Sequence, residues 1–186
     1  MALGYDKPEI ANEFYDKELF TFDSKTEKWK TKFNPDNYKA KNFSEEVVDA
    51  KSGKVVINLG EKINYLNAKK LSNEGLKDIL VSRESLYGKF LHKDIKVNDE
   101  EEGTFKIGTE INDTVIQQIL DASIHSLEIS VTNSINKGAY LLTTILNDKN
   151  NTKEEAITEV YKMLRPGEPP TIEIATQIFN NLFFSS

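Results

Sequence analysis

Residues 160–171 read Val-Tyr-Lys-Met-Leu-Arg-Pro-Gly-Glu-Pro-Pro-Thr. The first half is suited to a helix, and Pro166 would end that helix because proline has no backbone N–H and clashes with the preceding turn. The run that follows predicts a stiff connector, since each proline fixes its own φ and restricts the residue before it. Thr171 is a good cap for another helix. The stretch therefore predicts two helices joined by a rigid turn.

Helix signals lie on both sides of this turn. Thr152 and Glu155 have the spacing of a capping box, which predicts a helix start. Apolar residues recur at helical spacing after that start and again after Thr171. The first set is Ala156, Ile157, Val160, Tyr161, Met163 and Leu164, and the second is Ala175, Ile178, Phe179, Leu182 and Phe183. A shorter helix is predicted before them, over 137–146.

The sequence finishes on Phe183 and Phe184 followed by two serines. An exposed aromatic pair makes a sticky surface, which is unusual at a native terminus. We therefore expect the chain to be a segment of a longer polypeptide.

The first forty residues predict a helix and a hairpin. Asp6 and Pro8 are typical of a helix start, so a helix should run to about Asp16. Apolar alternation over 19–22 and 29–33, on either side of a polar turn, predicts two antiparallel strands.

The middle of the chain contains an internal repeat, with one copy at 48–81 and the other at 95–131. A shift of 48 residues superimposes glycines and apolar positions of the two copies. The matched pairs are Gly60 and Gly108, Ile63 and Ile111, Leu71 and Ile119, Leu76 and Ile124, and Ile79 and Leu127. Each copy would form a hairpin, a helix and a closing strand, with Asn64 and Asn112 as helix caps.

Composition excludes several classes of site. The 186 residues include no cysteine, so disulfides, thiolate nucleophiles and cysteine-bound zinc are absent. No apolar run approaches the roughly 20 residues of a membrane helix. The net charge is -6, whereas an autonomous nucleic-acid binder usually carries a basic surplus. Residues 24–41 nevertheless hold six lysines, and residues 98–130 hold eight acids, including Asp99–Glu102.

Few side chains suggest catalysis. His92 and His125 have no ligand-like neighbour at helical spacing, so we interpret them as surface or partly buried residues and predict no metal site. Residues 29–33 alternate aromatic and basic types, a pattern that can stack bases and pair phosphates. The same pattern is more typical of an edge strand whose lysines face water, and we favour that interpretation.

Residues 161–171, together with 178–185, closely resemble a stretch of the bacterial RNA polymerase β subunit. The family form reads approximately Glu-Ile-Tyr-Arg-Met-Met-Arg-Pro-Gly-Glu-Pro-Pro-Thr, then a helix ending Leu-Phe-Glu-Asn-Leu-Phe-Phe-Ser. The joined motifs are highly specific, and the resemblance extends over nearly all of the chain. It is looser over 133–140 and 147–152, which indicates a divergent lineage.

The resemblance and the patterns together imply an α+β fold in two parts. Residues 1–16 and 132–186 resemble the lobe of the β subunit and are expected to be helical. Residues 17–131 resemble an insertion that many β subunits carry in the lobe, and would hold the hairpin and the two repeats.

The resemblance implies a structural role in DNA-templated transcription. The lobe forms one wall of the downstream DNA cleft, so the segment itself is expected to be non-catalytic within a nucleotidyltransferase. Its partners would be the β′, α, ω and σ subunits and DNA. No cofactor is expected, because the catalytic magnesium of the parent enzyme is held by β′. The location would be cytoplasmic, at the nucleoid, with no membrane contact.

Two cations are the candidate DNA contacts. Arg165 matches a family arginine that faces nucleic acid, and Lys162 stands where the family usually has arginine, a change that loses the planar fork. Both also suit a helix C-terminus, where cations interact favourably with the helix dipole.

Two other functions are alternatives. The insertion can be chiefly a docking module for a transcription factor, a hypothesis motivated by the acidic run at Asp99–Glu102. A small standalone enzyme is disfavoured by the absence of cysteine and by the isolated histidines.

Overall fold

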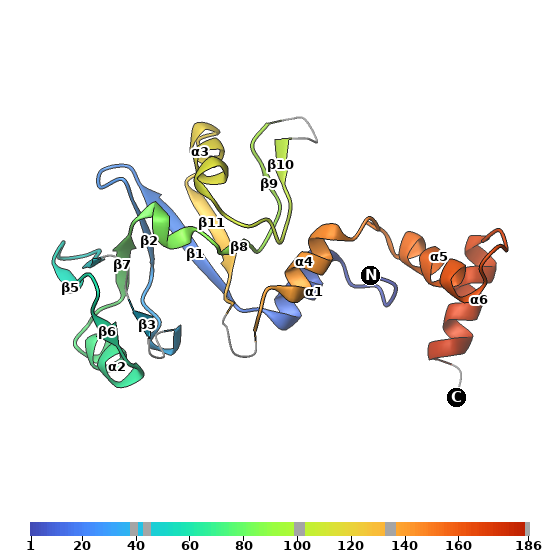
Figure 1. Ribbon diagram of the computed structural model, residues 1–186, viewed down its shortest axis with the longest axis horizontal. Coiled ribbons are helices and arrows are strands. Elements are labelled where there is room, and N and C mark those ends of the chain that lie inside the picture. The colour runs from blue at the N-terminus through green and yellow to red at the C-terminus, as the bar shows by residue number, and fades with distance from the viewer. Residues whose placement is uncertain (38–40, 43–45, 99–102, 133–136, 185–186) are drawn as a thin grey trace.

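The computed structural model describes residues 1–37, 41–42, 46–98, 103–132 and 137–184. These residues form six α-helices, two short 3-10 helices and several short strands (Figure 1). The helices are α1 Lys7–Phe14, α2 Tyr65–Asn73, α3 Asp113–Asp121, α4 Tyr140–Asn147, α5 Lys153–Leu164 and α6 Ile172–Phe183, and the 3-10 helices are η1 Pro35–Asn37 and η2 Arg83–Leu86. The strands are β1 Lys17–Asp23, β2 Lys28–Lys32, β3 Lys41–Asn42, β4 Val47–Asp49, β5 Val55–Ile57, β6 Lys62–Ile63, β7 Asp78–Val81, β8 Phe90–Leu91, β9 Ile95–Lys96, β10 Thr104–Phe105 and β11 Ser126–Ser130.

The main sheet has the strand order β5-β4-β7-β2-β1-β11-β8, and its strand pairs are antiparallel. The β1–β2 hairpin lies at its centre, and β7 and β11 pair with the two outer sides of that hairpin. An antiparallel sheet with helices packed on it agrees with the α+β class predicted from the sequence.

The prediction that residues 29–33 form an edge strand is wrong. β2 pairs with β1 on one side and with β7 on the other. Trp29 and Thr31 face the core, while Lys30 and Lys32 point to the opposite, exposed face. Alternation reports only that one face of a strand is buried, and both edge and central strands of a one-sided sheet satisfy it.

The largest core lies between one face of this sheet and the helices α2 and α3. Phe20 and Trp29 from the central hairpin are almost completely buried, as are Ile116 and Ile119 from α3. Burying side chains of this size contributes roughly 1.5–3 kcal/mol each. The helix N-caps predicted from sequence are confirmed, because Asn64 and Asn112 each accept a bond from the backbone N–H three residues later.

A second, smaller core joins the sheet region to α1 and α4. Ala11 of α1 and Leu142 of α4 pack with Ile107, which lies in the loop after β10. The next residue, Gly108, has φ +84°, and a Cβ there would lie 2.4 Å from the carbonyl oxygen of Leu142. Only glycine permits both this φ and this close approach.

Helix α4 begins later than the predicted residue 137. Its first residue is Tyr140, and Ala139 occupies the cap position without a side-chain hydrogen bond. Gly138 directly before it has low helix propensity, which accounts for the shortened start.

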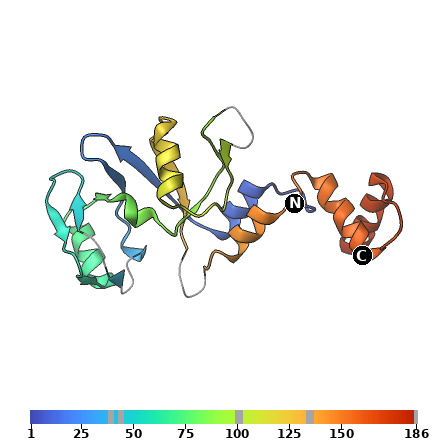
Figure 2. The same cartoon turned by 45° about the horizontal axis from the view of Figure 1, so that its top comes forward.

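Helices α5 and α6 form a helical hairpin at one end of the molecule, beyond α1 and α4 (Figures 1 and 2). Their shared core is Ile157, Tyr161, Ala175 and Phe179. The predicted apolar face of α5 is wrong at its last two positions, because Met163 is 81% exposed and Leu164 is 51% exposed. The core with α6 covers a narrow stripe of α5, and these two residues beside it remain in solvent.

Candidate nucleic-acid interface

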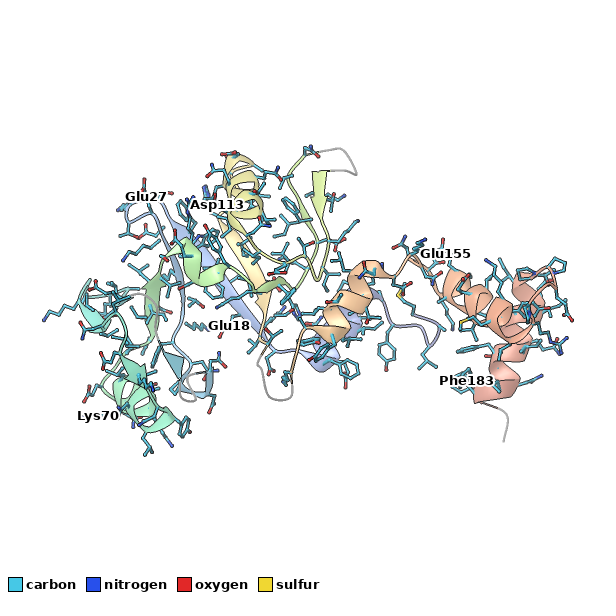
Figure 3. The ribbon with its side chains drawn as sticks, viewed as in Figure 1. Glu18, Glu27, Lys70, Asp113, Glu155 and Phe183 are labelled. Atoms are coloured by element: carbon cyan, nitrogen blue, oxygen red, sulfur yellow. The ribbon has the colours of Figure 1, made fainter. Side chains whose placement is uncertain are left out.

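The two candidate cations lie where α5 ends. The capping box predicted for this helix is present: Thr152 accepts from the backbone N–H of Glu155, and the Glu155 carboxylate accepts from that of Thr152. Figure 3 labels Glu155 at the start of α5 and Phe183 towards the end of α6. Arg165 is the C-cap of α5, and its backbone N–H donates to the carbonyl oxygen of Tyr161 at 2.9 Å.

Arg165, Pro166, Gly167 and Glu168 form a tight turn. The backbone N–H of Glu168 donates to the carbonyl oxygen of Arg165 at 3.3 Å, and Gly167 has φ +91°. Proline at the second position and glycine with positive φ at the third are the residues that a type II β-turn requires. The local sequence therefore specifies this turn, as predicted, and Thr171 caps α6 after it.

One oxygen of Glu168 joins the turn to the helix. The Tyr161 hydroxyl donates to Oε2 of Glu168 at 3.0 Å, and Nη1 of Arg165 donates to the same oxygen at 3.3 Å. These two hydrogen bonds, from Tyr161 first and then from Arg165, lower the pKa of Glu168. Burial, and then the bond to Glu168, raise the pKa of Tyr161. At neutral pH the stable state is therefore a protonated Tyr161 that donates to an ionised Glu168.

Both candidate cations are accessible, and each has a carboxylate partner. The Arg165 side chain is 53% exposed. Nζ of Lys162 lies 3.2 Å from a carboxylate oxygen of Glu159, three residues earlier on α5. Each of these contacts uses one nitrogen of its cation, so Lys162 and Arg165 keep donors that can bind an anion.

Comparison with known proteins identifies the relatives of this chain. The β subunit of DNA-directed RNA polymerase from Rhizobium leguminosarum bv. trifolii is 37% identical over 186 residues. The β subunits from Rickettsia conorii and Caulobacter vibrioides are 36% and 34% identical over 185 residues. The chain is homologous to one segment of the bacterial RNA polymerase β subunit.

The similarity covers 100% of the chain but only 13% or 14% of each of these β subunits. No protein-family model matches the chain. The resemblance to RNA polymerase β subunits inferred from the turn motif is thereby confirmed, although the turn is only a small part of the aligned length.

The lysine-rich strand does not offer bases a stacking surface. Trp29 is fully buried and Phe33 is nearly so, both on the core side of the sheet. The lysines on the other face are partly engaged, since Lys30 lies 3.4 Å from Asp78. Stacking of bases on these aromatics is therefore excluded, while a phosphate contact by the lysines would not involve them.

Glu128 binds two lysines that come from different parts of the sheet region. Its carboxylate lies 2.7 Å from Nζ of Lys93 and 2.9 Å from Nζ of Lys17. Hydrogen bonds from Lys93 and then Lys17 lower the pKa of Glu128 to about 2. Sequence reasoning missed this cluster because the three residues are distant along the chain.

The structure buries His92, contrary to the sequence interpretation of a surface or partly buried residue. Nδ1 of His92 lies 2.9 Å from the Ser130 hydroxyl, and Nε2 lies 3.0 Å from Oδ1 of Asn12. Burial, and then the nearby Lys17, lower the pKa of His92. A neutral ring that accepts from Ser130 and donates to Asn12 fits these contacts, so His92 is a structural link between α1 and the sheet.

A cavity of about 790 Å³ opens beside the start of β1 and the end of β2. Its lining includes Glu18, Glu128 and Asp16, which already accept hydrogen bonds from Asn37, from Lys17 and Lys93, and from Lys137 respectively. Within the described ranges, no group of three or more His, Cys, Asp or Glu side chains is arranged to hold a metal ion. These three carboxylates of the lining are therefore already engaged by neighbouring side chains.

The acidic run at Asp99–Glu102 lies outside the described residues. Among the residues that are described, no helix has the length and apolar character needed to cross a lipid bilayer.

Proposed function

We propose that this chain is a non-catalytic structural segment of a bacterial RNA polymerase β subunit and helps to form the wall of the downstream DNA cleft. The observation that carries the proposal is an exposed arginine, Arg165, on a sequence-specified turn of a chain that is homologous throughout to β subunits. Lys162 lies one helical turn earlier and is similarly exposed. Together the two cations would contact the phosphate backbone of DNA.

The proposed division of the chain is a lobe made of residues 1–16 and 132–186, with residues 17–131 inserted between them. Hydrogen bonding at the junction supports it, because the backbone N–H of Val131 donates to the carbonyl oxygen of Asp16 at 2.8 Å. The insertion would thus leave and re-enter the lobe at adjacent points of β1 and β11, as is expected of a domain added within a loop.

The insertion itself is proposed to contain two repeats, at 48–81 and 95–131. Their helices α2 and α3 have asparagine N-caps at matched positions, and their closing strands β7 and β11 flank the central hairpin symmetrically. The strand that pairs with β11 on its outer side is β8, which precedes the proposed boundary of the second copy. The second repeat would then begin near Phe90 rather than at 95.

In the assembled enzyme the segment would meet the β′, α, ω and σ subunits and DNA. The enzyme would work in the cytoplasm at the nucleoid, and its catalytic magnesium would be held by β′, so this segment would bind no cofactor. These assignments rest on the homology with β subunits.

The direct test replaces Arg165 with Ala in polymerase reconstituted with the β subunit that carries this segment. Loss of a phosphate contact should shorten the lifetime of competitor-resistant promoter complexes about tenfold, with a smaller effect at high salt. Unchanged lifetimes across several salt concentrations would remove Arg165 from the DNA interface.

The alternative function is a docking module for a transcription factor, favoured by the four consecutive acids at Asp99–Glu102 between β9 and β10. Replacing residues 17–131 with a short Gly/Ser linker separates the two functions, since the ends to be joined are adjacent. If basal transcription survives and only factor-dependent regulation is lost, docking is the role of the insertion. If promoter opening fails in an assembled enzyme, the insertion takes part in handling DNA.

A further inference from the structure

The guanidinium group of Arg165 uses only part of its bonding capacity. It has five N–H donors in a planar fork. Nη1 donates to Oε2 of Glu168 at 3.3 Å, and within the described part of the chain Nε and Nη2 have no hydrogen-bond partner. The Nε–Nη2 edge has the geometry that binds two oxygens of one phosphate.

The carboxylate that holds Nη1 is itself fixed on two sides. The backbone N–H of Glu168 donates to the carbonyl oxygen of Arg165 and closes the type II turn. Oε2 of Glu168 accepts from the hydroxyl of Tyr161, whose ring is buried between α5 and α6. These bonds restrain the Glu168 carboxylate at the end of α5. An arginine tied to a fixed carboxylate loses fewer rotamers when it binds an anion than a free one does.

We infer that Glu168, fixed by Tyr161, is a positioning residue that holds one end of the Arg165 guanidinium and presents its Nε–Nη2 edge to a backbone phosphate of nucleic acid. The inference rests on the proposed function, because it specifies how Arg165 would make its DNA contact. It assigns to the Pro-Gly-Glu turn a chemical purpose beyond connecting two helices. An exposed carboxylate beside a phosphate-binding arginine would otherwise only repel the phosphate.

The neighbouring pair of Lys162 and Glu159 provides a matched control. It is also a cation with a carboxylate partner on α5, at 3.2 Å and with similar exposure. Glu159, however, lies within the helix, and among the described residues its carboxylate accepts from Lys162 alone. Lysine also has no planar fork for a neighbour to orient.

The experiment measures the lifetimes of competitor-resistant promoter complexes formed by reconstituted polymerase on one fluorescently labelled promoter DNA. The variants are Glu168→Gln, Tyr161→Phe, Arg165→Ala, the double variant of Arg165 and Glu168, and Glu159→Gln as control. Removing a negative charge near DNA should by itself lengthen the lifetime. Positioning predicts the opposite: Glu168→Gln shortens it about threefold, Tyr161→Phe less, and the double variant no more than Arg165→Ala.

The readouts separate the two proposals. If Arg165→Ala shortens the lifetime but Glu168→Gln lengthens it, or behaves like Glu159→Gln, the positioning role is wrong and the DNA contact stands. If Arg165→Ala has no effect, the DNA contact itself is wrong and the positioning role falls with it. Amide exchange of α5 and α6 in each variant shows that the hairpin is folded, so that a loss caused by unfolding is recognised. Arg165→Lys should not restore the lifetime, because lysine keeps the charge and loses the fork.

Discussion

Individual side chains stabilise contacts between parts of the chain that are far apart in sequence, and Glu128 is the clearest example. It lies on β11 and binds Lys17 of β1 and Lys93 of the segment after β8. Its pKa of about 2 lies below the ordinary value of 4.5. Its ionised form is therefore favoured by folding, which makes the contribution of Glu128 to stability dependent on pH.

We predict that Glu128→Gln lowers the free energy of unfolding by about 1 kcal/mol at pH 7, a value kept small because both lysines are half exposed. Since the folded pKa is depressed, the stabilisation is complete above about pH 4.5 and is lost as the pH falls towards 2. Urea unfolding of both proteins at several pH values measures the difference. Glu74→Gln, which removes the exposed partner of Lys70, should change little at any pH, and a pH-independent Glu128 effect would contradict the assignment.

Residues that act through local spacing were predictable, whereas those that act through tertiary contacts were not. The caps at Asn64, Asn112 and Thr152 follow from positions three residues apart. The bonds of His92 to Asn12 and Ser130 join residues 80 and 38 positions away, for which one sequence gives no signal. Glu168 is an intermediate case. Pro166 and Gly167 predict the turn that contains it, but its hydrogen bond from Tyr161 depends on the fold.

Helices α2 and α3 end in the same way, but they differ in the residue that adopts a positive φ after the cap. In α2 the N–H of Leu76 donates to the Leu71 carbonyl, and in α3 the N–H of Ile124 donates to the Ile119 carbonyl, both at 3.1 Å. These are Schellman bonds, which need a residue with positive φ after the cap. That residue is Gly75 in α2 but Ser123, with φ +59°, in α3. The serine is strained where glycine would not be.

We predict that Ser123→Gly raises the free energy of unfolding by about 0.5 kcal/mol, because the strain it relieves exceeds the added entropy of the unfolded chain. Ser126→Gly, the same chemical change at an exposed position of β11, should instead lower it by about 0.5–1 kcal/mol. Thermal unfolding of the two variants provides the comparison. Destabilisation by Ser123→Gly would show that the serine side chain contributes more than its backbone strain costs.

The β1–β2 hairpin could be predicted from the sequence, but its central place in the sheet could not. Alternation over residues 19–22 and 29–33 predicts two strands joined by a turn, and β1 and β2 pair as expected. Their central position depends on β7 and β11, which come much later in the chain. The hydrophobic pattern of a strand records which face is buried, but it does not record its neighbours.

At the scale of the whole molecule, the described residues form three separate cores rather than one. The sheet with α2 and α3 forms the largest, α1 and α4 share a second, and α5 and α6 share a third (Figure 1). Phe179 belongs to the third, and the N-terminal Ala2 packs beside it. The cations proposed to contact DNA therefore lie on a small helical unit whose stability depends on few residues.

Separate cores predict separate unfolding, because cooperative units follow contiguous packing. Phe179→Ala removes a nearly fully buried ring and should cost about 3–5 kcal/mol within the α5–α6 unit. Native-state hydrogen exchange should then show faster exchange over residues 153–183, by on the order of a hundredfold or more, with no change in β1, β2 and β11. Leu127→Ala, in the core of the sheet, should give the reverse pattern. Equal acceleration of both regions by either substitution would mean that the chain unfolds as one unit, and that the turn carrying Arg165 draws its rigidity from the whole molecule rather than from its own hairpin.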